Sequence, residues 1–147
     1  MNWPHFHLLI NHFPIIGIFL AILYWVVALV RRSRELQTVG MWLIVFLAVM
    51  TIPTFISGDE AAEALASLPM ASPEKIGTHH EAAEFALTLM EVLGVWSLAG
   101  CVLFRKRESY PAWFLYVTLL LILVLAATMA RTANLGGQIM HLEISET

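Results

Sequence analysis

The sequence has few charged residues and almost no cysteine. Only 13% of its 147 residues are charged, whereas 59% are hydrophobic and the mean hydropathy is +0.77. Because about a quarter of the residues in a soluble domain are charged, this composition excludes an ordinary soluble protein. The one cysteine, Cys101, cannot form a disulfide within the chain. The few basic residues mostly flank apolar runs, so nothing supports a nucleic-acid-binding function.

Four long apolar runs predict four transmembrane helices. Each run approaches the roughly 20 residues that cross the hydrocarbon core of a bilayer. The runs extend from about Leu8 to Val30, Val39 to Ile56, Ala82 to Phe104 and Ala112 to Ala130. The first run is too long for the core of a signal peptide, so we expect it to be a mature helix. The predicted fold class is all-α, an antiparallel up-down four-helix transmembrane bundle in a single domain, 1–147.

Two further features of the chain affect this prediction. The acidic segment from Ser57 to Gly77 is predicted to be the one sizeable loop. Within it, a short interfacial helix is expected to begin near Asp59, because a carboxylate favours a helix N-terminus. Pro14 and Pro53 are expected to bend their helices, because proline cannot donate a backbone hydrogen bond.

The basic residues predict the orientation of the bundle. Six of the eight Lys and Arg residues lie in the two short connections, as Arg31, Arg32 and Arg34 and as Arg105, Lys106 and Arg107. By the positive-inside rule, both connections are expected to be cytoplasmic. Both termini and the long loop are then expected on the periplasmic side of a bacterial inner membrane, with the lipid bilayer as the surrounding medium.

All six histidines fall at the other end of the predicted helices: His5, His7, His12, His79, His80 and His141. In a straight helix His7 and His12 would point about 140° apart, so they are expected to serve different sites. His79 and His80 are adjacent, so one is expected to face the bundle and the other its rim.

This grouping of imidazoles predicts haem binding. A b-type haem iron takes two axial imidazoles, and facing helices of a bundle can supply them. We expect one or two haems b, with His12 and His80 binding one and His7 and His141 a second, shallower one. Asn11 and Arg131 are expected to contact the haem propionates. The protein would then transfer electrons to a redox partner protein or membrane complex, rather than act as a stand-alone enzyme.

Two alternatives from other functional classes stay open. Carboxylates at the same end permit a non-haem metal site in a carrier or sensor. They are Asp59, Glu60, Glu63, Glu81, Glu84 and Glu143. The protein could also be a cofactor-free accessory subunit of a membrane complex, and homo-oligomerisation stays open. Glu91 lies inside the third apolar run, where a carboxylate could relay protons, bind a quinone or simply be protonated and hydrogen-bonded.

Four segments resemble an uncharacterised bacterial family of small four-helix inner-membrane proteins. They are HLLINHFPIIG at 7–17, SGDEAAE at 57–63, HEAA at 80–83 and ANLGGQIMHLEI at 133–144. The resemblance covers nearly the whole chain. It implies the four-helix topology and four recurrent histidines: His7, His12, His80 and His141. His5 and His79 fall outside the family pattern and are the weaker ligand candidates.

Overall fold

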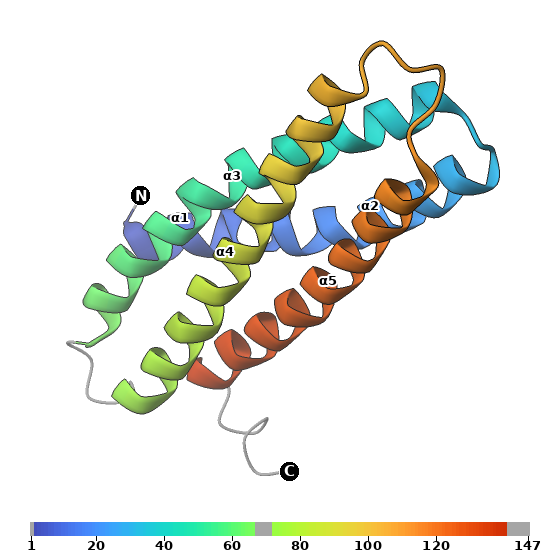
Figure 1. Ribbon diagram of the computed structural model, residues 1–147. Coiled ribbons are helices and arrows are strands. Elements are labelled where there is room, and N and C mark those ends of the chain that lie inside the picture. The colour runs from blue at the N-terminus through green and yellow to red at the C-terminus, as the bar shows by residue number, and fades with distance from the viewer. Residues whose placement is uncertain (1, 67–71, 141–147) are drawn as a thin grey trace.

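The described part of the chain folds into five helices that form four membrane-length rods. The computed structural model describes residues 2–66 and 72–140. The helices are α1 (Trp3–Ile10), α2 (His12–Val30), α3 (Arg34–Ala66), α4 (Pro73–Leu103) and α5 (Ala112–Met140). α1 and α2 follow one another along the first rod, and all four rods are long and apolar enough to cross a membrane (Figure 1). The predicted all-α four-helix bundle is confirmed.

Three helices extend well beyond the apolar runs: α3, α4 and α5, the last of which reaches Met140 rather than Ala130. The prediction of a loop from Ser57 to Gly77 is wrong for most of its length, because α3 continues to Ala66 and α4 already begins at Pro73. Alanine, glutamate and leucine are strong helix formers, so the acidic segment prolongs α3. Asp59 therefore lies within α3, and no separate interfacial helix begins there.

The break between α1 and α2 has a local cause. α1 ends at Ile10, and α2 begins at His12. Pro14 has no backbone N–H, so it cannot donate to the carbonyl of Ile10, four residues earlier. Pro53, by contrast, lies inside α3, which continues on both sides of it.

The rods form a ring that is closed at one end and open at the other. α2 and α4 each pack against both α3 and α5, which places α2 diagonally opposite α4. α1 packs against α2 and α3, but over residues 2–66 and 72–140 it does not approach α4 or α5. Figure 1 shows α1 and the C-terminal half of α5 diverging. This divergence opens the bundle at the end opposite the two short connections.

The closed part of the ring contains the apolar core. Its largest fully buried side chains include Ile18, Trp25, Met41, Met90 and Ile122, which come from all four rods. Burying one such side chain contributes about 1.5–3 kcal/mol, although in a bilayer close packing replaces much of the hydrophobic term.

Candidate ligand cavity

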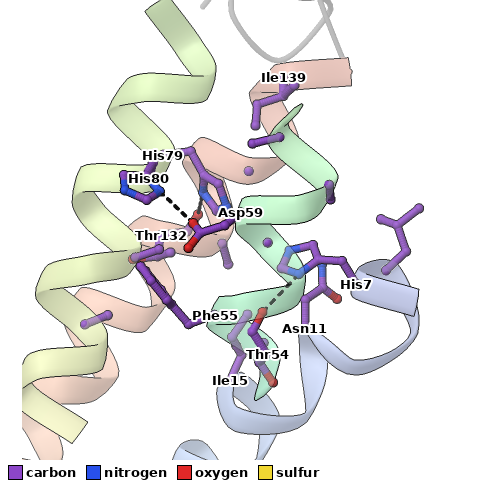
Figure 2. A pocket seen from close by; sticks show the side chains of 18 of the residues that line it. His7, Asn11, Ile15, Thr54, Phe55, Asp59, His79, His80, Thr132 and Ile139 are labelled. Carbon is purple, nitrogen blue, oxygen red and sulfur yellow. Dashed lines mark hydrogen bonds and ion pairs between the residues drawn. The ribbon is translucent and has the colours of Figure 1, made fainter. Parts of the chain in front are cut away.

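A cavity of about 570 Å³ lies where the bundle opens, and α1, α2, α3, α4 and α5 all contribute to its lining. Most lining side chains are apolar, including Leu8, Leu87 and Met129. Figure 2 shows two others, Ile15 and Phe55. Nitrogen-bearing and carboxylate side chains enter it from six positions: His7, Asn11, His12, Asp59, His79 and His80. A cavity of this size, mostly apolar with a few convergent polar groups, is typical of a small-molecule or cofactor site.

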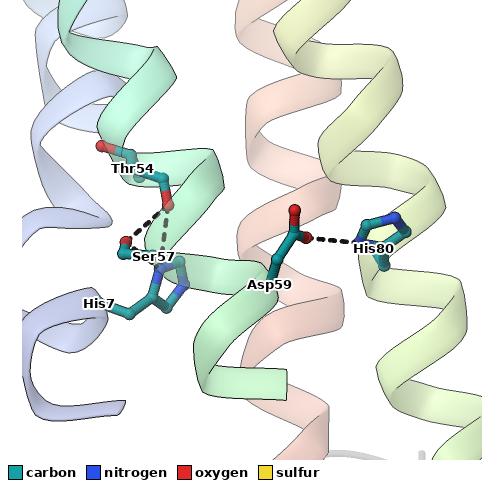
Figure 3. Close-up of polar contacts among 5 residues, drawn as sticks. All are labelled: His7, Thr54, Ser57, Asp59 and His80. Atoms are coloured by element: carbon teal, nitrogen blue, oxygen red, sulfur yellow. Dashed lines mark hydrogen bonds and ion pairs between the residues drawn. The ribbon is translucent and has the colours of Figure 1, made fainter. Parts of the chain in front are cut away.

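The His7 imidazole is held by α3. Its Nδ1 lies 3.2 Å from the carbonyl oxygen of Thr54 and 3.0 Å from Oγ of Ser57 (Figure 3). The Ser57 hydroxyl donates its own hydrogen to the same Thr54 carbonyl, at 2.8 Å. Both oxygens can therefore only accept from His7, so Nδ1 carries the ring proton. Nε2 then holds a lone pair, and no residue that the structure describes is bonded to it.

The His79 imidazole is held in the same way by α5. Its Nδ1 lies 3.1 Å from the carbonyl oxygen of Thr132, which can only accept. The single hydrogen of the Thr132 hydroxyl is shared between the carbonyl of Ala82 on α4, at 3.1 Å, and that of Thr128 on α5 itself, at 3.0 Å. His79 Nδ1 therefore carries the proton. Its Nε2 also holds a lone pair with no bonding partner among the residues described.

A glycine lies beside each of these two rings. A Cβ atom at Gly58 would lie 3.1 Å from Cε1 of His7, and one at Gly136 would lie 3.0 Å from Cε1 of His79. Each glycine follows the accepting carbonyl by four residues, at Thr54 and Thr132 respectively. α3 and α5 thus support the two imidazoles with the same arrangement: a carbonyl that fixes Nδ1–H and a glycine that leaves room for the ring.

His80 has a different kind of partner. Its Nδ1 lies 3.1 Å from Oδ1 of Asp59, and both side chains are about half exposed (Figure 3). The Phe55 ring lies beside it, with 5.6 Å between the ring centroids. The pair links α3 to α4 at the cavity. Adjacent histidines thus differ as expected, because His79 is partly buried against α5 while His80 is exposed.

The break before α2 changes where His7 and His12 point. Both line the same cavity, so the expectation of separate sites, which assumed a straight helix, is wrong. The His12 side chain is exposed and makes no hydrogen bond or ion pair with any described residue. Asn11, at the break itself, has a buried Oδ1 atom with no partner within 2–66 and 72–140.

The remaining site residues that the sequence suggested do not line the cavity in the described part of the chain. Arg131 is exposed and does not line the cavity, and His5 is exposed on α1. Glu91 is partly buried outside the cavity, with Oε1 unpartnered in the described part of the chain. His141 lies outside the described residues.

The structure contains no obvious metal-ion cluster in its described ranges. No group of three or more His, Cys, Asp or Glu side chains there could hold a metal ion together. Comparison with protein-family models, curated proteins and solved structures finds no significant match to the chain. The cavity and the two imidazoles with a free Nε2 are therefore the basis for assigning a function.

Proposed function

We propose that the protein is a membrane-bound b-type haem protein for electron transfer, and that His7 and His79 are the axial ligands of one haem in the cavity. One observation carries this proposal. Two imidazoles line a single cavity, each with Nδ1–H on a backbone carbonyl and with Nε2 unbonded to any residue that the structure describes. Metal-bound histidines are characteristically oriented by such a hydrogen bond from the other ring nitrogen.

The number of ligands favours haem over a single metal ion. A structural zinc ion takes four protein ligands and a catalytic one takes three, whereas a haem iron needs only two axial ligands from the protein. The described residues offer two such imidazoles and no group of three possible ligands. When bound, the haem would supply reversible one-electron oxidation and reduction.

The other cavity residues have roles that follow from their positions. The carbonyls of Thr54 and Thr132 fix the rotation of the two imidazoles, and the apolar walls exclude water. Asn11 lines the cavity, and the N–H groups of its side-chain amide could donate to a propionate, whereas its oxygen can only accept. Imidazoles in both axial positions would leave no open coordination position, which suits electron transfer better than oxygen chemistry.

This ligand pair differs from the one that the sequence favours. The Asp59 carboxylate orients His80 as a carbonyl would, but His80 is exposed. His12 is exposed as well, and its ring makes no hydrogen bond with any described residue. His7 and His79 are both oriented by carbonyls and partly buried, so we propose them in place of His12 and His80. The second haem that the sequence predicts, on His7 and His141, would compete with the first haem for His7. His141 lies outside the described residues.

The setting of the protein is also a proposal. Six basic residues at the end opposite the cavity favour a bacterial inner membrane with that end in the cytoplasm. The cavity would then open near the periplasmic face. The electron donor or acceptor would be a redox protein or membrane complex.

Haem content tests the proposal directly. Protein purified after expression with a haem precursor is expected to show a Soret band, a reduced α-band and about one haem per chain for this one pair of ligands. The His5→Ala variant is the control and should keep its haem, because His5 is exposed and does not line the cavity. Colourless wild-type protein under these conditions would contradict the proposal.

The Gly136→Ala variant is expected to bind haem about 10-fold more weakly, which is the lower end of the range for disturbing a group that orients a metal-binding histidine. The added Cβ would lie 3.0 Å from Cε1 of His79, so the ring must shift. Haem titration of the apoprotein measures the change. Gly77→Ala is the matched control, because nothing lies within 4 Å of the Cβ that it would add. Equal haem affinities in the two variants would show that Gly136 does not support the His79 imidazole.

A further inference from the structure

The end of the bundle opposite the cavity carries a second distinctive surface. Five exposed basic side chains lie in the two short connections. We call this set the basic rim: Arg31, Arg32, Arg105, Lys106 and Arg107. Arg32 turns the chain between α2 and α3 with φ at 47°, in the left-handed region.

Arg34 holds the two connections together. Its Nη2 donates to the carbonyl oxygen of Phe104, at the C-terminus of α4, over 3.0 Å. Its guanidinium also lies 3.7 Å from the ring centroid of Tyr110, just before α5. The Tyr110 hydroxyl is in turn 3.2 Å from Oγ1 of Thr38 on α3. The start of α3 is thus fixed to the connection between α4 and α5, so both parts of the basic rim lie at the same end of the bundle.

The charge of the basic rim is not neutralised by the described part of the chain. No rim side chain forms an ion pair with a carboxylate of residues 2–66 or 72–140. Two acidic residues, Glu35 and Glu108, are also exposed at this end, against the five exposed basic residues of the rim and the partly buried Arg34. A positive surface next to apolar helices attracts anions from the membrane surface.

Apolar side chains lie directly beside these charges. Leu103 and Val30 are 73% and 75% exposed, and Trp113 is 58% exposed. The Arg107 guanidinium lies 5.6 Å from the centroid of Phe104, whose ring packs edge-on against Trp113. A soluble anion would use the charges only. An amphiphile would use the charges and the apolar side chains together.

We propose that the basic rim binds the phosphodiester headgroups of anionic phospholipids, with the acyl chains lying against Val30, Leu103 and Trp113. Guanidinium groups bind phosphate oxygens through paired, charge-assisted hydrogen bonds, so several exposed arginines suit this headgroup. Clusters of four to eight basic residues beside transmembrane helices are typical of anionic-lipid binding. The site is independent of the haem cavity.

Spin-labelled lipids test this site. Protein reconstituted in phosphatidylcholine should immobilise spin-labelled phosphatidylglycerol about fivefold more than spin-labelled phosphatidylcholine, as measured by EPR. The Arg105→Gln/Arg107→Gln double variant should reduce that preference. Arg34→Gln should reduce it as well, although the rim charges remain, because the two connections are no longer tied together. Arg131→Gln is the matched control, since Arg131 is an exposed arginine outside the basic rim on α5.

Three results would overturn the proposal. They are equal immobilisation of the two lipids by the wild type, a preference unchanged in the double variant, and an equal loss in Arg131→Gln. Binding of inorganic phosphate distinguishes a lipid headgroup from soluble phosphate as the ligand. If the wild type binds inorganic phosphate but immobilises the two lipids equally, the ligand is soluble phosphate and the lipid assignment fails. Circular dichroism of each variant shows that a lost preference is not lost folding.

Discussion

Alanine in place of either His7 or His79 is expected to remove the same haem. Each substitution removes the Nε2 lone pair of a residue that lines the cavity. A haem with a single axial histidine is held more weakly and changes spin state. We expect haem content to fall at least 10-fold in each variant, as typical even for disturbed outer-shell partners of a metal ligand. The double variant should contain no less haem than the single variant with the lower haem content, because both residues serve one site.

The neighbouring histidine provides the matched control. The His80→Ala variant loses the contact with Asp59 and the Phe55 ring but leaves both carbonyl-anchored imidazoles in place. It should therefore keep its haem with an unchanged spectrum. If His80→Ala and His12→Ala instead remove the haem while His79→Ala spares it, the ligand pair is the one that the sequence alone favours.

The Gly94→Ala variant is expected to destabilise the bundle by about 1–3 kcal/mol, the usual cost of overpacking a close interface. α3 and α4 approach each other closely here, so that a Cβ at Gly94 would lie 2.6 Å from Cβ of Ala48. Both atoms are fixed to helix backbones, so the helices themselves must separate. Thermal unfolding in detergent, followed by circular dichroism, measures the loss.

A second substitution tests the cause of that loss. The Ala48→Gly change removes the opposing Cβ, so Gly94→Ala/Ala48→Gly should recover part of the stability through a favourable coupling of the two sites. The Gly77→Ala control meets no atom within 4 Å and should be neutral or slightly stabilising, because alanine is the better helix former. Equal loss in Gly94→Ala and Gly77→Ala would show that close approach is not the cause.

The sequence predicts the four rods well because crossing a bilayer requires long apolar runs, and hydropathy measures that requirement. It predicts the ends of α3, α4 and α5 poorly, because helices continue past the apolar core wherever the residues favour them. The segment after Ser57 is rich in alanine and glutamate, so α3 extends to Ala66. Hydropathy contains no information about that extension.

The site is only partly predictable for a different reason. The histidines at one end are visible in the sequence, but the rotation of each helix is not. His79 is anchored by Thr132, which lies 53 positions away on another helix. The break at Asn11 also brings His7 and His12 to one cavity. The spacing Thr-x-x-x-Gly, which occurs at Thr54 and at Thr132, is the sequence feature that could have indicated the two imidazole supports.

The central claim is that His7 and His79 together hold one haem. Low-temperature EPR of the oxidised wild-type protein tests it most directly, because two axial imidazoles give a low-spin ferric iron. We expect a low-spin signal that disappears in both His7→Ala and His79→Ala and persists in His80→Ala. A high-spin wild-type signal, or a low-spin signal that survives the loss of His79, would contradict the claim.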